Sequence, residues 1–160
     1  MNSQRLTTKS AGAEKSLFEL ALQAIKEIEV KKGSVIQFCG PISTGGFGNI
    51  DENIECISST IQAAEKIGIP VFNQMAYERR MDLILENHTG YDYPLLEFFY
   101  KPILESGKIG ALLFLPLWET SVGSKWEHDF AKSINIPVFY LEGPFIVEIR
   151  TIYEKIKSPS

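Results

Sequence analysis

The sequence predicts one α/β domain built as three layers, with a doubly wound parallel sheet between two layers of helices. Short apolar segments alternate with helical patterns along the chain, which is typical of parallel strands joined by crossover helices. Residues 109–115 (IGALLFL) are apolar on both faces, as a strand covered on both sides must be. A chain of 160 residues, 44% hydrophobic and 22% charged, can bury the core that this fold needs.

The N-terminal part of the chain predicts a tail and then an extra helix. Residues 1–12 lack apolar periodicity and are expected to form a disordered tail, which leaves a single domain over residues 13–158. After the tail, apolar residues recur at helical spacing and form one stripe: Leu17, Leu20, Ala21, Ala24, Ile25 and Ile28. The first strand is expected over residues 34–39 (SVIQFC).

The middle of the chain predicts a loop, a helix and a second strand. The glycine-rich loop over residues 40–48 follows the first strand, and Asp51 is expected to cap the next helix, which Gly68 ends. Residues 69–72 are expected to form the second strand. The remaining elements are expected in this order: helices over 77–86 and from Pro94 to a kink at Pro102, the central strand 109–115, a helix over 124–134, a strand over 136–141, and a last helix with Ile149, Ile152, Tyr153 and Ile156 on one face.

The order of these elements predicts where a ligand binds. Residues 64–72 (AEKIGIPVF) and 131–139 (AKSINIPVF) use the same helix-to-strand sequence twice. Doubly wound sheets bind ligands beyond the carboxyl ends of their strands, at the point where strand order reverses. The sheet is expected to be flavodoxin-like or Rossmann-like, and in a flavodoxin-like order this point lies between the first strand and the strand 109–115. The loops that follow them, 40–48 and 116–124, are therefore expected to share one ligand site.

The first of these loops combines glycines with hydroxyl groups: Gly40, Ser43, Thr44, Gly45 and Gly46. Glycine lets backbone N–H groups approach a ligand closely, and the N-terminus of the following helix favours an anion. The loop lacks the Gly-Lys-Ser/Thr ending of a phosphate-binding P-loop. A flexible surface loop is the alternative, because glycine clusters are common in turns.

The second loop leads to Glu127, which has two interpretations. Ser124 and Glu127 have the spacing of a capping box, so capping alone would explain the glutamate. A carboxylate in the first turn of a helix is also expected to stay ionised, because the helix dipole favours its charge. An ionised carboxylate is what a nucleophile at an anomeric carbon must be. The sequence leaves both roles open.

Other chemistry-bearing residues favour structural roles. His128 and Asp129 follow Glu127 directly, but successive helical residues do not face one another, so no metal site is expected. Cys39 has no histidine spaced to activate it and is interpreted as a buried, inert thiol. The aromatic side chains of residues 91–100 are interpreted as core. Neither a metal nor a cofactor is expected.

Composition limits the classes of partner and the compartment. The net charge of −4 disfavours a nucleic-acid polymer, which binds basic faces. No apolar run approaches the length of a membrane span, and residues 1–10 lack the apolar core of a secretory signal. Two cysteines without metal-type spacing, Cys39 and Cys56, indicate reduced thiols and a cytoplasmic protein.

Residues 38–49 (FCGPISTGGFGN) and 115–131 (LPLWETSVGSKWEHDFA) together resemble the nucleoside 2-deoxyribosyltransferase superfamily. The likeness is greatest to its nucleotide N-glycosidase branch and to uncharacterised members with a Leu-Pro-x-Trp start, and it spans roughly residues 34–141. It implies that Glu127 is the nucleophile of a glycosyl-enzyme intermediate. The substrate-binding residues expected from the loops and the resemblance are Gly40, Ser43, Thr44, Gly45, Gly46, Asn73, Glu97, Trp118, Ser121 and Gly123.

The chain departs from that family in two places. The nucleotide-cleaving branch usually has an arginine in the first loop, where this chain has Ser43 and Thr44. The transferases have an aspartate in the helix before the central strand, where this chain has Glu97 as a substitute and Lys101, which could instead serve a phosphate. The general acid that protonates the leaving base stays open among these candidates: Glu97, Asp92 and Tyr93.

The leading hypothesis is hydrolysis or base exchange at the N-glycosidic bond of a nucleoside or nucleoside 5′-monophosphate. The alternatives are a non-catalytic nucleotide- or metabolite-binding module on the same fold, and a structural or regulatory protein whose loops contact a partner. A homo-oligomer, at least a dimer, is expected for two reasons. The N-terminal helix and the aromatic segment 91–100 offer more apolar surface than one domain hides, and the resembling family builds its sites across dimers.

Overall fold

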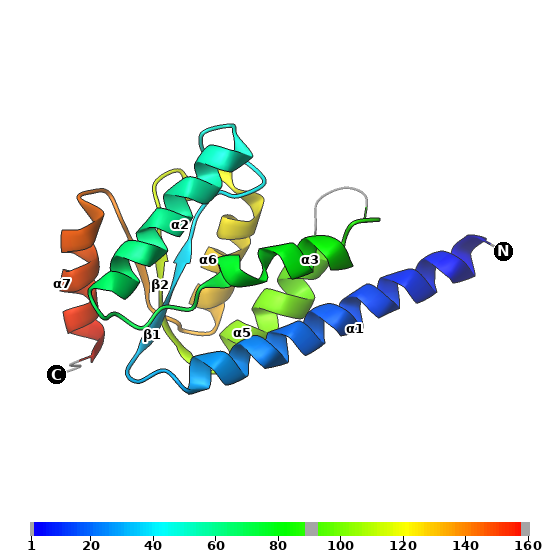
Figure 1. Cartoon of the computed structure of the whole chain (residues 1–160), viewed down its shortest axis with the longest axis horizontal. Helices are drawn as coiled ribbons and strands as arrows, with labels where there is room; N and C mark the ends of the chain where they lie inside the picture. The colour runs from blue at the N-terminus through cyan, green and yellow to red at the C-terminus, as the bar shows by residue number, and fades with distance from the viewer. Residues whose placement is uncertain (1, 89–92, 158–160) are drawn as a thin grey trace.

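The computed structural model describes residues 2–88 and 93–157 and shows a mixed α/β fold (Figure 1). Its sheet contains three parallel strands in the order β1-β2-β3. These are β1 (Val35–Cys39), β2 (Ile109–Phe114) and β3 (Val138–Tyr140). The predicted α/β class with a parallel sheet is confirmed, and each strand lies within a predicted segment.

The strand register brings the carboxyl ends of β1 and β2 together. Val35 pairs with Ile109 and Cys39 pairs with Phe114, with one register shift after Val35. On the other edge of β2, Leu112 pairs with Val138. Because the strands are parallel, the loops that follow β1 and β2 leave the sheet from the same edge.

The predicted second strand, residues 69–72, is reduced to a single bridge between Ile36 and Val71. Two hydrogen bonds join it to β1: the Ile36 N–H donates to the Pro70 carbonyl at 3.0 Å, and the Phe72 N–H donates to the Ile36 carbonyl at 2.9 Å. Pro70 has no N–H to donate, so a longer ladder is interrupted here. The segment still lies beside β1, on the edge opposite β2.

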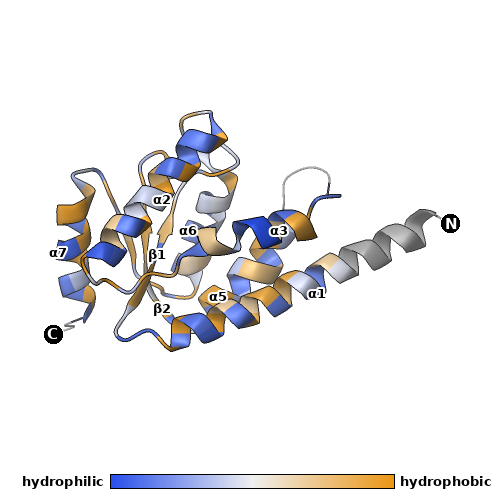
Figure 2. Ribbon diagram, in the orientation of Figure 1, coloured by the Kyte–Doolittle hydropathy of each residue, from blue (hydrophilic) through white to orange (hydrophobic). Residues whose placement is uncertain are grey.

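Alternate side chains of a strand point to opposite faces, and the strands contribute to two separate hydrophobic clusters. Cys39 and Phe114 belong to one hydrophobic cluster, together with residues of α1 (Asn2–Glu29), α3 (Glu78–Ile84), α5 (Lys101–Glu105) and α6 (Val122–Ser133). Phe38 and Leu113 belong to a second cluster with α2 (Ile50–Lys66) and α7 (Phe145–Lys157). Figure 2 shows β1 and β2 as hydrophobic, whereas the helices alternate between hydrophilic and hydrophobic stretches.

Helix α1 is 28 residues long and begins at Asn2. It therefore includes residues 2–12, for which the sequence predicts a disordered tail. Extending a helix that is already formed adds one hydrogen bond per residue, so a polar segment without proline can continue a packed helix. The predicted apolar stripe is buried at Leu17, Ala21 and Ala24. Within the described residues, no helix combines the length and apolar character needed to cross a bilayer.

A widened helical turn precedes the central strand. Helix α4 (Tyr93–Leu95) continues into the π-helix η2 (Leu96–Tyr100) and then into α5. Pro102 lies in the first turn of α5, and it cannot donate a backbone hydrogen bond into the preceding turn. The kink that the sequence predicts at Pro102 takes the form of this π-helical turn. Its consequence is local: η2 brings Leu96 and Tyr100 to the wall of a cavity.

Candidate active site

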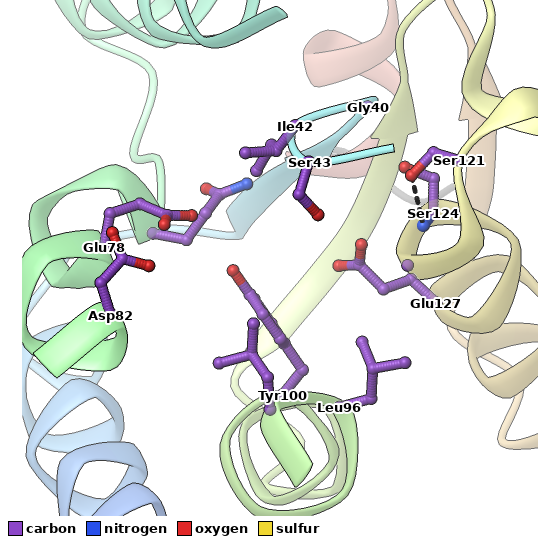
Figure 3. A pocket seen from close by; sticks show the side chains of 13 residues that line it. Gly40, Ile42, Ser43, Glu78, Asp82, Leu96, Tyr100, Ser121, Ser124 and Glu127 are labelled. Atoms are coloured by element: carbon purple, nitrogen blue, oxygen red, sulfur yellow. Dashed lines mark hydrogen bonds between the residues drawn. The ribbon is translucent and has the colours of Figure 1, made fainter. Parts of the chain in front are cut away.

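A cavity lies where the loops after β1 and β2 meet (Figure 3). The space that a small molecule can reach there measures about 90 Å³. Gly40, Ile42 and Ser43 line it from the first loop, and Ser121, Gly123, Ser124 and Glu127 line it from the start of α6. The opposite walls come from the 3-10 helix η1 (Gln74–Tyr77), from α3 and from η2. Ser43 and Ser121 lie on one cavity, as the strand topology predicts.

Helix α6 begins earlier than the sequence predicts, and this changes the interpretation of Glu127. The N-cap is Ser121, whose hydroxyl accepts a hydrogen bond from the Ser124 N–H at 3.3 Å. Both serines can cap a helix. The predicted helix start at Ser124 is wrong, because the cap lies three residues earlier, at Ser121. Glu127 therefore lies in the second turn, outside the capping position. The capping explanation for Glu127 falls away.

The Glu127 carboxyl is buried and is held by β1. Only 8% of the residue is exposed. Its Oε2 atom accepts a hydrogen bond of 2.6 Å from Gln37 Nε2 and one of 3.3 Å from Cys39 Sγ. Gln37 and Cys39 are two residues apart on one strand, so they point to the same face of the sheet. Both donors contact one oxygen, which leaves Oε1 as the atom that can meet a ligand.

Burial raises the pKa of Glu127 to about 7, while the hydrogen bonds from Cys39 and Gln37 lower it in part. The expectation that the helix dipole keeps this group fully ionised is wrong, because Glu127 is past the first turn and removed from water. Burial and the neighbouring Glu127 charge also raise the pKa of the Cys39 thiol, so that thiol stays neutral and can donate. Near neutral pH the carboxyl exists in both protonation states.

The glycine-rich loop packs against the second loop. The Val122 N–H donates to Thr44 Oγ1 at 3.0 Å, and the Gly46 N–H donates to Thr120 Oγ1 at 2.7 Å. Gly45 has a φ of 65°, and a Cβ there would lie 2.1 Å from the Thr120 carbonyl oxygen. Glycine is required at this contact, because any side chain would collide with the backbone. Thr44, Gly45 and Gly46 join the two loops and do not line the cavity.

Asn73 and Glu97 have local partners. Asn73 caps η1, where its Oδ1 accepts from the Met75 N–H at 3.1 Å. Glu97 lies 3.7 Å from Lys101 in a partly exposed ion pair. None of these three side chains lines the cavity.

Trp118 and the other acid candidates lie elsewhere. The Trp118 ring stacks on His128, with centroids 4.4 Å apart, and on Tyr140, with centroids 5.7 Å apart. This aromatic group faces a separate surface hollow between the ends of β2 and β3. Tyr93 is 59% exposed and does not line the cavity, and Asp92 lies outside the described residues.

Sequence reasoning missed several residues of this site. Gln37 had a visible signal, because a polar side chain in the apolar segment VIQFC needs a buried partner. No signal in the sequence indicates Gln74, Glu78 or Asp82, because only the packing of η1 and α3 brings these residues to the cavity. Tyr100 was assigned to core packing; it is 6% exposed, and its hydroxyl points into the cavity (Figure 3).

Among residues 2–88 and 93–157, no group of three or more His, Cys, Asp or Glu side chains could hold a metal ion. No protein-family model, curated protein or solved structure matches this chain. A functional assignment therefore depends on the geometry of the cavity.

Proposed function

We propose that this protein cleaves the N-glycosidic bond of a nucleoside or nucleotide, by hydrolysis or base exchange, with Glu127 as the nucleophile. The observation that supports this most is the buried Glu127 carboxyl at the cavity, with Oε2 bound by Gln37 and Cys39. Capping does not explain this carboxyl, and burying it lowers stability. A buried carboxyl at a cavity, kept at a cost in stability, favours a functional role.

The proposed fold is the doubly wound, flavodoxin-like or Rossmann-like sheet of the resembling deoxyribosyltransferase superfamily. The segment around Val71 lies on one edge of β1, and β2 lies on the other edge. Across the sheet, the order is therefore the Val71 segment, β1, β2 and β3, which are the second, first, third and fourth extended segments along the chain. That is the start of a flavodoxin-like order, in which ligands bind between the first and third strands. The cavity lies beside the loops that follow β1 and β2.

In the proposed reaction, Glu127 Oε1 attacks C1′ of the sugar and forms an ester. The C1′–N bond breaks, and its electron pair leaves with the base, which takes up a proton from a donor in the cavity. The incoming water or second base later returns a proton to that donor. Water or a second base then attacks C1′ and releases the Glu127 carboxylate. Because Gln37 and Cys39 bind only Oε2, they would hold the carboxyl in place without blocking Oε1.

The leaving base needs a hydrogen-bond donor, and we assign this role to Tyr100. Its hydroxyl points into the cavity that Glu127 also lines (Figure 3). Tyr100 packs edge-on against Phe99, with ring centroids 4.9 Å apart, so its ring has a defined position. This assignment replaces the acid candidates from the sequence: Glu97 and Tyr93 do not line the cavity, and Asp92 lies outside the described residues.

A non-catalytic ligand-binding module is the second candidate. One observation favours it: the reachable space of about 90 Å³ is small beside the roughly 300–1,000 Å³ of typical ligand pockets. A space of this size suits a sugar ring, and the base would extend through the mouth of the cavity. A module that binds only a small polyol would use the same residues.

The test is a panel of nucleosides and their 5′-monophosphates, with free base measured by chromatography. Base released by the wild type, and lost in Glu127→Gln, supports the proposed enzyme. Ligand-dependent shifts in melting temperature without release of base support the binding module.

We further propose a homo-oligomer in the reducing cytoplasm, in keeping with two cysteines outside any disulfide. Phe18 and Leu22, each 44% exposed, form an apolar strip on α1. The aromatic segment 91–100 offers less surface for self-association than the sequence predicts, because Phe99 is fully buried within the chain and cannot contact a second copy. Light scattering should give at least twice the mass of the 18.0 kDa chain; a monomer at micromolar concentration would contradict this proposal.

A further inference from the structure

The described residues that line the cavity carry negative charge and no positive charge. Glu78 and Asp82 of α3 lie on the wall opposite Glu127 (Figure 3). Among the described residues that line the cavity, none is lysine, arginine or histidine. Lys101, which the sequence suggested for a phosphate, pairs with Glu97 at 3.7 Å outside the cavity.

Packing against α1 holds the acidic wall in place. Tyr77, directly before α3, is 1% exposed, and its hydroxyl donates a hydrogen bond to the Glu27 carboxylate. The Arg80 guanidinium lies 4.5 Å from the centre of the Tyr77 ring and donates to Gln23 Oε1 at 3.4 Å. The positive charge of Arg80 is therefore directed toward α1, and Arg80 does not line the cavity.

Two buried polar atoms at the cavity have no partner. Gln74 is 2% exposed; its Nε2 donates to the Phe38 carbonyl at 2.6 Å, while its Oε1 has no hydrogen bond. Ser124 is 1% exposed, and its Oγ has no partner either. Both residues line the cavity. A buried polar atom without a partner is costly, and the amide oxygen of Gln74 can be satisfied only by a donor.

We propose that this cavity binds a neutral or cationic polyol, and that Glu78 and Asp82 are specificity-determining residues that exclude phosphorylated ligands. Two independent observations support this inference: the charged side chains among the described lining residues are all acidic, and a buried acceptor without a partner requires a hydroxyl or ammonium donor. The identification of the polyol as the sugar of a substrate rests on the proposed function. Together with phosphate exclusion, it makes the substrate a nucleoside without a phosphate. The exclusion of phosphate depends on charge and does not require catalysis.

The size of the effect follows from Coulomb repulsion. A phosphate monoester carries about −1.5 to −2 charges at neutral pH. Each ionised carboxylate in a partly solvated cavity should lower the affinity for a phosphorylated ligand by about tenfold, relative to the same ligand without phosphate. Salt screens such repulsion at a partly open site, so high ionic strength should weaken the discrimination.

The test uses three probes: ribose, ribose 5-phosphate, and a pyrrolidine polyol whose ring nitrogen is protonated at neutral pH. Each is titrated into the full chain at low salt, and binding is followed by NMR chemical shifts. We expect the cationic probe to bind most tightly and ribose 5-phosphate at least tenfold more weakly than ribose. Equal or tighter binding of ribose 5-phosphate, or no binding of any probe at millimolar concentration, would overturn the inference.

The double variant Glu78→Gln/Asp82→Asn keeps the shape of the wall and removes its charge. It should reduce the preference for ribose over ribose 5-phosphate by about tenfold or more. The control, Glu55→Gln/Glu65→Gln, removes the same charge from exposed positions of α2 outside the cavity and should leave the preference unchanged. An unchanged preference in the Glu78/Asp82 variant, or an equal change in the control, would overturn the assignment. If the double variant fails to fold, the single variants answer the same question.

The two proposals fail in different ways. Release of base from nucleotides, with ribose 5-phosphate bound tightly, would retain the glycosidase and overturn phosphate exclusion. The expected probe order without release of base from any nucleoside would retain phosphate exclusion and overturn the glycosidase.

Discussion

Gln37 on β1 donates a hydrogen bond of 2.6 Å to Glu127 on α6, 90 positions further along the chain. The donor comes from a buried strand, and the acceptor comes from the helix that follows the neighbouring strand. This bond lowers the pKa of Glu127, against burial, which raises it. The two residues therefore form one unit, in which the strand sets the orientation and the protonation of the carboxyl.

Replacing Gln37 should change the pH dependence of the reaction. Gln37→Met keeps the volume but removes the donor, so the pKa of Glu127 should rise further and less carboxylate should be present at pH 7. The pH profile of base release should shift to higher pH. The matched control is Gln62→Met, an exposed position on α2. An unchanged profile in Gln37→Met would show that this bond does not control the carboxyl.

Cys39 should act through its hydrogen bond and not as a nucleophile. Its thiol donates to Glu127 Oε2 at 3.3 Å. Cys39→Ser keeps a donor and should retain most activity, whereas Cys39→Ala should raise the pH at which activity appears. Initial rates from pH 5 to 9 distinguish the two. Equal loss in both variants would indicate a role for the sulfur itself.

Protein stability should depend on the ionisation of Glu127. Its pKa is about 7 in the folded protein and about 4.3 in an unfolded chain. A raised folded pKa contributes stability that is complete below pH 4 and is lost as pH rises through 7. Relative to wild type, Glu127→Gln should therefore gain up to about 3 kcal/mol in unfolding free energy between pH 4 and pH 8. Urea unfolding at both pH values measures this, and parallel pH curves would contradict it.

Tyr100→Phe should lower base release by at least about tenfold, the usual scale for losing one proton or hydrogen-bond donor at a reacting group. The effect should appear in kcat more than in KM, because the hydroxyl acts mainly on the leaving base. The control Tyr93→Phe changes an exposed tyrosine outside the cavity and should be neutral. A variant with a higher KM and an unchanged kcat would assign Tyr100 to binding alone.

Much of the framework could be predicted from local pattern. The apolar segments predict the positions of all three strands, and a parallel topology predicts that Ser43, Ser121 and Glu127 lie at one cavity, as the structure has them. The start of α6 was missed because Ser121 and Ser124 are equally good caps by sequence. The second strand was overestimated because Pro70 breaks its ladder.

The rest of the site depends on packing that the sequence does not reveal. Glu78 and Asp82 reach the cavity because Tyr77 is bound to Glu27, 50 positions earlier in the chain. Tyr100 reaches it through a π-helical turn. The raised pKa of Glu127 follows from burial, which is a property of the whole fold.

The most direct test is mass spectrometry of wild type and Glu127→Gln, as intact chains and as proteolytic peptides, after quenching during reaction with a nucleoside that releases base. If Glu127 is the nucleophile, the wild-type peptide that contains Glu127 should carry a covalent sugar adduct. The glutamine variant should carry no adduct, and its base release should fall by several orders of magnitude. A variant that keeps more than about a tenth of wild-type turnover, a barrier change below roughly 1.4 kcal/mol, would contradict the assignment of Glu127 as nucleophile.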